Sequence, residues 1–526
     1  MEKEQLLKTN CFTEEEWDLT PQGVKNFVVQ QKLRIQELEN EQEELKKILE
    51  NLQEKVNCNS TNSSIPPSTE IVKLERKKPS RRKKRSRGGQ KGHVGYSREL
   101  YPESECRSVQ NHLPETCKCC GEKLSGTDEN PYRHQVVEIP PIELEIVEHR
   151  LHKLKCNHCG TTTRANLPNN VSESGYGATV VALVSVMSGV YRHSHRMIVS
   201  AMSDFFGVKI SLGTVNRLRN EASVALSSAV EEVKTYIQSA PIVNADETGF
   251  SQGNNDGKNP LGKKAWLWVA VTPLITYFQV TLSRCTNAAM DLLGENFGGI
   301  LGSDRYSSYN WVDVKRRQLC WAHLKREFQK ISERSGASRQ VGRNLMAQEK
   351  KLFRLWRRVR DGTLSRKEFQ LLVLRIRSRV QEILTETAEF EIGSREKSPW
   401  AKTVRTCRQL LKVETALWLF VEVSDLEPTN NSAERAIRPA VLWKKTSFGS
   451  QSENGSIFVA RMLTVVSSLR SQNRSVLEFI RETITAHRLR ISTPSLIPTA
   501  IAVNSVGSLL ASDQIDTDEE SIPLVA

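Results

Sequence analysis

The sequence predicts a protein of several domains, in which a mixed α/β domain follows helical segments and a small cysteine-rich domain. Three observations support this prediction. The chain has 526 residues, which is too long for a single compact core. Its apolar pattern changes along the chain, from a heptad repeat to short strand-like runs and then to long amphipathic helices. Two close cysteine pairs lie between the heptad repeat and the strand-like runs.

The composition of the chain indicates the kind of partner, the location and the role of the cysteines. The chain carries 75 Lys and Arg residues against 61 Asp and Glu residues, a formal net charge of +14, which favours a polyanionic partner. Its apolar stretches are too short to cross a membrane, and the N-terminus lacks the apolar core of a signal peptide, so we expect a cytoplasmic protein. Eleven cysteines in a chain without an export signal favour metal binding over disulfides.

Residues 24–56 have the heptad pattern of a short coiled coil. One core position is held by Ile35, Gln42, Leu49 and Val56, and the other by Leu38, Leu45 and Leu52. Charged residues fill much of the remainder, and Gln42 would be a polar register marker. We expect this helix to pair with a second copy of the chain, which predicts a homo-oligomer. The alternative is a helix that packs on its own chain.

A flexible basic linker is predicted over 57–95. Residues 57–70 are rich in Ser, Thr, Asn and Pro, and ten of the fifteen residues in 73–87 are basic. Such a run can neutralise phosphates without reading sequence, although a merely solvated segment is the alternative. The candidate phosphate contacts are Arg81, Arg82, Lys83, Lys84 and Arg85.

Residues 105–170 predict a zinc ribbon. Two Cys-x-x-Cys pairs flank a stretch, 136–154, whose apolar residues alternate as in strands, and four thiolates from two tight turns complete a tetrahedral site. Such a site is structural, because four cysteines leave no open position for a substrate. Cys119 and His158 lie inside the pairs as competing ligands. The predicted ligands of this single Zn²⁺ are Cys117, Cys120, Cys156 and Cys159.

Residues 175–238 are helical by pattern and contain a helix-turn-helix-like segment. A helix over 194–206 is followed by Gly207, a Ser cap at 211 and a second helix. Two helices that meet at a glycine are more often simple packing than a DNA reader, and this alternative stays open. The candidate DNA contacts on the second helix are Asn216, Arg217 and Arg219.

Residues 240–324 and 426–490 predict the α/β domain. Five strands are expected at 242–245, 265–272, 275–283, 299–303 and 317–321, with a helix at 287–296 between the third and fourth. This order is typical of a ribonuclease-H-like mixed sheet, in which the first and fourth strands are neighbours. A basic helical insertion, 325–425, interrupts the domain, and a tail predicted to be disordered, 491–526, ends the chain.

Three acidic residues suit a metal site in this fold. Asp246 and Asp304 follow apolar runs that read as buried strands, and Glu434 lies at the start of a probable helix. Adjacent carboxylates repel each other unless a cation neutralises them, and three can hold two Mg²⁺ ions. Glu247 is a rival for Asp246, although strand alternation directs it to the opposite face. Beside Glu434, Arg435 and Arg438 are candidate phosphate contacts.

Four motifs carry a resemblance to a known family. They are Asn-Ala-Asp-Glu-Thr-Gly (244–249), Ser-Asp-Arg-Tyr-Ser-Ser-Tyr (303–309), Cys-Trp-Ala-His-Leu-Lys-Arg-Glu-Phe (320–328) and Pro-Thr-Asn-Asn-Ser-Ala-Glu-Arg-Ala-Ile-Arg-Pro (428–439). In this order they resemble the insertion-sequence-66 family of bacterial DDE transposases. The resemblance implies a ribonuclease-H-like catalytic domain whose three acids are Asp246, Asp304 and Glu434. It also implies that His323, in a Cys-x-x-His element with Cys320, stands near the active centre.

The expected function follows from the resemblance and the carboxylates together. It is a nucleoid-associated transposase that binds the terminal inverted repeats of its element, cleaves DNA with two Mg²⁺ ions and joins the ends to target DNA. Small accessory proteins of the same element are possible partners, and no membrane is involved. One alternative is a catalytically silent DNA-binding regulator with the same fold. Another is a nuclease that cuts without joining.

Overall fold

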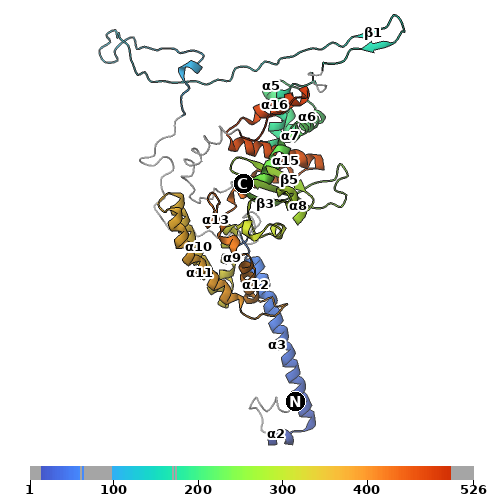
Figure 1. Ribbon diagram of the computed structural model, residues 1–526, viewed down its shortest axis with the longest axis vertical. Coiled ribbons are helices and arrows are strands. Elements are labelled where there is room, and N and C mark those ends of the chain that lie inside the picture. The colour runs from blue at the N-terminus through green and yellow to red at the C-terminus, as the bar shows by residue number, and fades with distance from the viewer. Residues whose placement is uncertain (1–13, 60–61, 64–97, 169–170, 172–174, 499–526) are drawn as a thin grey trace. The chain divides into compact units, whose positions relative to one another are not determined.

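The structure is a computed structural model that describes residues 14–59, 62–63, 98–168, 171 and 175–498 (Figure 1). The predicted phosphate contacts at 81–85 and the predicted tail beyond 498 lie outside these residues. The chain divides into two compact units, one formed by residues 75–148 and the other by the remainder. Among the described helices, none is both long and apolar enough to span a bilayer.

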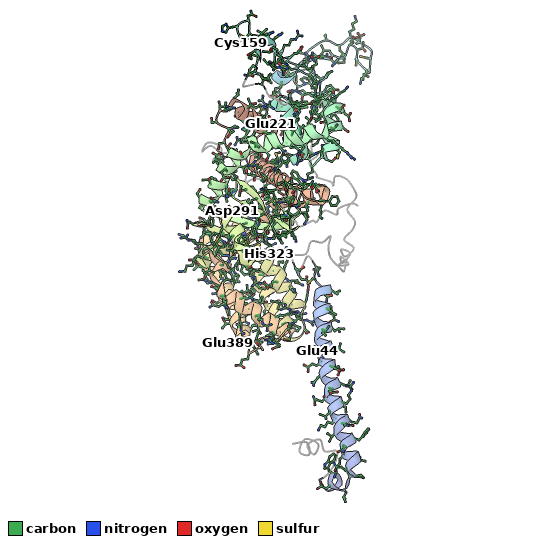
Figure 2. All side chains as sticks on the ribbon, turned by 90° about the vertical axis from the view of Figure 1, so that its right-hand side faces the viewer. Glu44, Cys159, Glu221, Asp291, His323 and Glu389 are labelled. Atoms are coloured by element: carbon green, nitrogen blue, oxygen red, sulfur yellow. The ribbon has the colours of Figure 1, made fainter. Side chains whose placement is uncertain are left out.

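The N-terminal heptad segment is a helix, as predicted. A short helix, α2 (Glu14–Leu19), precedes α3 (Gln22–Val56), which is 35 residues long. Leu38, Leu45 and Leu52 of the predicted core seam are 48%, 65% and 54% exposed. Figure 2 shows side chains near Glu44 projecting from this helix. An exposed leucine seam on a helix of this length leaves apolar surface for a partner to cover.

The unit formed by residues 75–148 contains little regular structure. Besides the single-turn helix η2 (Glu103–Glu105) and an isolated antiparallel bridge between Thr116 and Lys123, its described residues are turns and irregular backbone. The prediction of strands from 136 to 152 is wrong, since the first strand in this part of the chain is β1 (Lys153–Lys155), which pairs antiparallel with β2 (Thr162–Arg164). Alternation marks a strand only where one face is buried, and Val136 and Ile146 are 82% and 83% exposed.

A five-stranded mixed sheet forms the centre of the other unit. Its spatial order is β5-β4-β3-β6-β7, with β3, β4 and β5 antiparallel and β6 and β7 parallel to β3. The predicted adjacency of the first and fourth strands is therefore confirmed. The strands are β3 (Ile242–Phe250), β4 (Ala265–Val271), β5 (Thr276–Thr281), β6 (Ile300–Ser303) and β7 (Arg317–Leu319), with α8 (Thr286–Leu293) between β5 and β6.

Strand β3 is longer than the sequence predicts. It does not end before Asp246 but continues to Phe250, because its pairing with β4 runs to the Phe250–Ala265 pair. On its other side β3 pairs with β6 only from Ile242 to Asn244. Asp246 therefore lies within a strand that is paired on one side and open on the other. An acidic residue at the end of an apolar run is not a reliable sign that the strand stops.

Helices α14 (Asn431–Ser447), α15 (Glu453–Ser471) and α16 (Val476–Leu489) follow the insertion. α14 packs against β3 and β4, and α15 packs along the edge strand β5. The N–H groups of Thr276 and Phe278 donate hydrogen bonds to the hydroxyls of Ser468 and Thr464, at 3.1 and 3.0 Å. These hydroxyls pair backbone groups that an edge strand would otherwise leave open.

The segment 175–238 is helical, as predicted, but it does not have a separate core. Its buried residues belong to the same hydrophobic cluster as those of the sheet and of α14 to α16. The helix-turn-helix-like pair is present, with Gly207 in the left-handed region (φ 67°) and Ser211 capping the second helix through the Thr214 N–H. The helices are α4 (Ala178–Gly189), α5 (His195–Phe206), α6 (Leu212–Ala225) and α7 (Ser227–Ser239).

The helical insertion is present and begins earlier than predicted. Trp321, expected in the last strand, instead starts α9, because β7 ends at Leu319. A second hydrophobic cluster, with Trp321, Trp356 and Trp418 among its members, forms the core of this part. The helices are α9 (Trp321–Glu333), α10 (Gly336–Arg360), α11 (Arg366–Ala388), α12 (Pro399–Lys412) and α13 (Thr415–Glu422).

Candidate active site

The parallel pairing of β3 and β6 brings two predicted acids to one place. The last pair in this register joins Asn244 to Gly302. Asp246 lies two residues beyond that pair on β3, and Asp304 lies two residues beyond it in the loop after β6. Oδ1 of Asp304 accepts a hydrogen bond from the Tyr306 N–H at 2.8 Å, which orients the carboxylate within the loop.

Glu434 reaches the same place because the segment before α14 is tied to the sheet. The Trp321 N–H donates to the Pro428 carbonyl at 2.9 Å, and the Asn430 N–H donates to Sγ of Cys320 at 3.4 Å. The side-chain amide of Asn430 donates to the Ala245 carbonyl at 3.3 Å, on the strand that carries Asp246. α14 starts at the next residue, so Glu434 lies in its first turn.

His323 and Arg326 of α9 lie against Glu434. His323 Nδ1 is 3.5 Å from Glu434 Oε1, and Arg326 Nη2 is 3.4 Å from the same oxygen. Cys320 lies close to both, since potential ligand atoms of Cys320, His323 and Glu434 are within 4.8 Å of one another. Figure 2 labels His323 on this helix. The structure thus brings the four predicted active-site residues together.

The buried carboxylate of Asp246 lies near other negative charges. Burial raises the pKa of Asp246 well above its usual range, and the negative charges of Glu247, Asp304 and Glu434 raise it further. These carboxylates are therefore close enough to repel, which a bound cation would relieve. Carboxylate oxygens are the ligands that Mg²⁺ prefers, so Asp246, Asp304 and Glu434 fit it.

The surroundings of His323 favour its neutral form. Burial lowers the pKa of the imidazole, and the Arg326 guanidinium lowers it further, while Glu434 and Asp304 act in the opposite direction. A neutral imidazole beside a carboxylate can donate a hydrogen bond from one ring nitrogen and accept one at the other.

Glu247, the alternative to Asp246 as a metal ligand, points to the opposite face of the sheet. Both of its carboxylate oxygens accept hydrogen bonds there. Its Oε1 accepts hydrogen bonds from Nε and Nη2 of Arg284 at 2.9 and 2.6 Å, and its Oε2 accepts one from the Tyr309 hydroxyl at 2.6 Å. The Arg284 guanidinium also stacks 3.6 Å from the ring centroid of Tyr306. These contacts fasten β3 to the loop that carries Asp304, so Glu247 is a positioning residue.

Replacing Arg284 by Met is expected to destabilise the fold by about 3 kcal/mol, because it leaves a buried carboxylate without its cation. The Glu247 side chain is only 1% exposed. Thermal and urea unfolding would measure the loss. Arg305→Met is the matched control, since the Arg305–Glu327 pair is about one quarter exposed on both sides and should contribute about 1 kcal/mol or less. Equal losses in the two variants would contradict this assignment.

Each predicted zinc knuckle is a tight turn of the same design. The Cys117 N–H donates to the Glu122 carbonyl at 2.8 Å, and the Cys156 N–H donates to the Thr161 carbonyl at 2.8 Å. A glycine in the left-handed region follows each pair, at Gly121 and Gly160.

The thiols of these turns suit a metal. Backbone N–H groups of Cys120 and Cys119 lower the pKa of the Cys117 thiol, and hydrogen bonds from Thr161 lower that of Cys159. Lowered thiol pKa values favour the thiolates that Zn²⁺ binds.

The predicted DNA-contacting residues differ in their exposure to solvent. Asn216 and Arg217 are exposed on α6, and Arg435 and Arg438 are exposed on α14. Arg219 is different, because its guanidinium lies 4.2 Å from the ring centroid of Phe458 and bonds to Nε2 of His195 at 2.6 Å. These contacts hold Arg219 in the packing between α5, α6 and α15, so we leave it out of the proposed DNA-contacting set.

Sequence reasoning missed several residues around the site. Arg326 had a usable signal, since it lies three residues after His323 and so on the same face of a helix. Asn430 had a weaker one, as a capping residue before a helix. No local spacing in the sequence indicated that Arg284 and Tyr309 contact Glu247, because Glu247 lies far from both along the chain.

Comparisons with known proteins agree with this architecture. A family model described as "Transposase IS66 family" matches residues 176–457, and one described as "zinc-finger binding domain of transposase IS66" matches residues 114–160. Residues 24–99 match a family of unknown function, DUF6444.

Two relatives come from Sinorhizobium fredii (strain NBRC 101917 / NGR234). "Uncharacterized protein y4qI" is 24% identical over 72% of this chain and 71% of its own length. "Uncharacterized protein y4hP" is 23% identical over 71% of each. The transposase family model covers more than half of the chain, from the helices before the sheet to α15, and therefore includes the three carboxylates and His323. The chain belongs to the IS66 family of transposases.

Proposed function

We propose that this protein is an active transposase that cuts DNA at the terminal inverted repeats of its element and joins the freed ends to target DNA. The observation that carries the proposal is the convergence of Asp246, Asp304 and Glu434 from β3, the loop after β6 and the first turn of α14. The strand order β5-β4-β3-β6-β7 supports the proposed ribonuclease-H-like domain, in which such acids would hold catalytic metal ions.

The three carboxylates would hold two Mg²⁺ ions, which supply activation of the attacking oxygen and stabilisation of the leaving oxygen at a phosphodiester. The protein's own contribution is placement. β3 provides a rigid position for Asp246, the Tyr306 N–H orients Asp304, and Arg326 restrains Glu434. Removal of Mg²⁺ should therefore stop cleavage.

His323 and its neighbours would position the DNA. A neutral imidazole 3.5 Å from Glu434 can hydrogen-bond a phosphate oxygen next to the reacting bond. In the first step, water attacks the phosphodiester, and the bond to the 3′ oxygen of the element end breaks. The freed 3′-hydroxyl then attacks a target phosphodiester in line and displaces the 3′ oxygen of the target strand. Neither step needs a covalent link between protein and DNA.

DNA binding is assigned to several parts of the chain. The zinc-finger domain contributes through a Zn²⁺ held by Cys117, Cys120, Cys156 and Cys159, a choice supported by the identical turns around the two pairs. Asn216 and Arg217 of α6 and Arg435 and Arg438 of α14 are the exposed contacts, and the basic segment at 81–85 adds sequence-independent attraction.

The leucine seam of α3 is proposed to pair two protomers, so that two element ends meet in one complex. Replacing Leu38 and Leu45 by Asp should convert the oligomer to a monomer, because each variant side chain would place a charge in the seam. Light scattering after size-exclusion chromatography measures the mass. Gln36→Asp with Asn40→Asp, two positions off the seam, is the control and should remain oligomeric. An unchanged mass in the leucine variant would contradict the pairing.

A single assay separates this proposal from its alternatives. A labelled element end, incubated with the protein, Mg²⁺ and a target plasmid, should give a cleaved strand and a joined product. A silent regulator would give neither product, and a simple nuclease would give cleavage without joining. Joined product that forms equally well without divalent ions would contradict the carboxylate site.

A further inference from the structure

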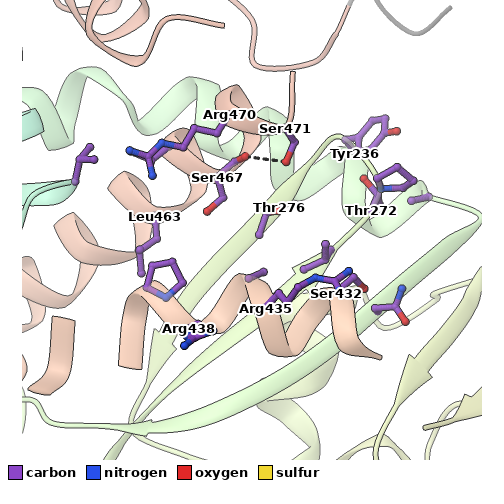
Figure 3. Close-up of a pocket in the computed structure, with 18 of the residues that line it drawn as sticks. Tyr236, Thr272, Thr276, Ser432, Arg435, Arg438, Leu463, Ser467, Arg470 and Ser471 are labelled. Carbon is purple, nitrogen blue, oxygen red and sulfur yellow. Dashed lines mark hydrogen bonds between the residues drawn. The ribbon is translucent and has the colours of Figure 1, made fainter. Parts of the chain in front are cut away.

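A large cavity lies beside the carboxylates, between α14, α15 and the sheet. Its volume is about 1200 Å³, which exceeds the roughly 300–1,000 Å³ usual for a small-molecule site. Figure 3 shows Arg435 and Arg438 on one helix and Arg470 on another, with sheet strands behind them. The cavity is thus large enough for an extended ligand rather than one compact metabolite.

Four arginines line this cavity and have free guanidinium groups. They are Arg192, Arg435, Arg438 and Arg470. Among the described residues none of these groups forms an ion pair or a side-chain hydrogen bond. Two acids, Asp425 and Glu427, also line the cavity. Burial lowers the pKa of Arg366 in α11, and the negative charges of these two acids act in the opposite direction, so both acids lie near that cation. The cavity therefore has an excess of uncompensated positive charge, which suits a ligand with several phosphates.

Part of the remaining wall is apolar. Trp443, Leu463 and Val466 line it, together with Tyr236 and Pro439. Double-stranded DNA keeps its bases stacked inside and could use only the charged rim. A strand with unpaired bases could place phosphates on the arginines and bases against the apolar wall, as proteins that bind single strands do.

The cavity is lined by residues of the two elements that carry Asp246 and Glu434, although neither carboxylate is among its lining residues. Ser432 and Arg435 line the cavity, and Glu434 lies between them in the first turn of α14. Asn244 lines it from β3, on the same face of the sheet as Asp246 two residues further on. A strand held in the cavity would therefore lie against the same helix and strand that carry Glu434 and Asp246.

We propose that this cavity binds unpaired DNA, holding a few nucleotides of one strand next to the phosphodiester that is cut. This inference rests on the proposed function for its choice of DNA as the ligand. It adds a binding site, with Arg192 and Arg470 as phosphate contacts that belong to neither the helix-turn-helix-like pair nor the zinc finger.

Fluorescence anisotropy with two kinds of probe tests the site. One is a short duplex of arbitrary sequence with blunt ends, and the other is the same duplex with an unpaired tail of about four nucleotides on either strand. Mg²⁺ is omitted so that the probes stay intact. We expect the protein to bind one tailed probe about ten-fold more tightly than the blunt probe.

The double variant Arg192→Ala and Arg470→Ala should lose this preference while keeping its affinity for the blunt duplex. Each lost phosphate contact should also reduce the salt dependence of tailed-probe binding, by about 0.7 in the log–log slope. Arg375→Ala, an exposed arginine of α11, is the control and should retain the preference. A wild-type protein without tail preference, or a double variant that keeps it, would overturn the proposal.

The outcome is independent of the cleavage assay. Tail preference without Mg²⁺-dependent cleavage would support the cavity and refute the proposed catalysis. Mg²⁺-dependent cleavage without tail preference would support the proposed catalysis and refute the cavity as a DNA site.

Discussion

The Asp246→Asn variant is expected to lose Mg²⁺-dependent cleavage of an element end by about a thousand-fold or more. The amide keeps the shape of the side chain but cannot carry the negative charge that holds a divalent ion. Binding of the uncut end should change by less than about two-fold, because DNA affinity comes from other parts of the chain. Gel analysis of a labelled end measures cleavage, and anisotropy measures binding.

The same variant has a second, independent signature in its stability. The raised pKa of Asp246 means that the fold disfavours the charged carboxylate relative to the unfolded chain. The protonated carboxyl group therefore stabilises the fold at low pH. This contribution is lost as the pH rises from the ordinary pKa of an unfolded Asp toward the raised pKa of Asp246 in the fold. Without Mg²⁺, Asp246→Asn should melt higher than the wild type at neutral pH, and the difference should shrink in acid.

With Mg²⁺ present, the wild type should melt at a higher temperature than Asp246→Asn, since the ion stabilises only a protein that binds it. Asp204→Asn, an exposed aspartate on α5, is the matched control and should retain cleavage and an unchanged melting temperature. Full cleavage by Asp246→Asn would show that the three-carboxylate site is not the catalytic centre.

Loss of a zinc ligand is the second large effect expected. Cys156→Ser should purify without its equivalent of zinc and bind the element end at least about ten-fold more weakly, because structural zinc contributes about 10–16 kcal/mol to folding of its site. Metal analysis of the purified protein gives the zinc content, and anisotropy gives the affinity. The hydrophobic cluster around β3 and α14 includes none of the described residues of 105–170, so unfolding of that cluster should be unaffected.

The competing ligands serve as controls. Cys119→Ser and His158→Ala should each retain one zinc ion, since both residues lie inside the turns rather than at their ends. Loss of zinc from Cys119→Ser, with retention in Cys120→Ser, would contradict the assignment of the outer cysteine pair.

Features with a local period were the ones that sequence reasoning predicted well. The helix at 24–56 and the paired helices around Gly207 depend on spacing within a few residues, whereas the strand order around Asp246 was predicted from the succession of strands and helices typical of a known fold. Alternation misled at 136–152, where apolar residues such as Val136 and Ile146 are exposed rather than covered on one face. The end of β3 was also misplaced, because its length is set by pairing with β4 rather than by the polarity of Asp246.

The chain by itself determined which side chains could do chemistry: carboxylates at the ends of apolar runs, thiols in paired turns and a leucine seam on a helix. Only the tertiary structure decided which of them meet. Asn430 brings Glu434 back to β3 across the whole helical insertion, Arg219 turns inward onto Phe458, and four arginines from three distant segments gather around one cavity. Spacing along a chain governs the local face of a helix or strand, whereas convergence depends on long-range pairing and packing that no local pattern contains.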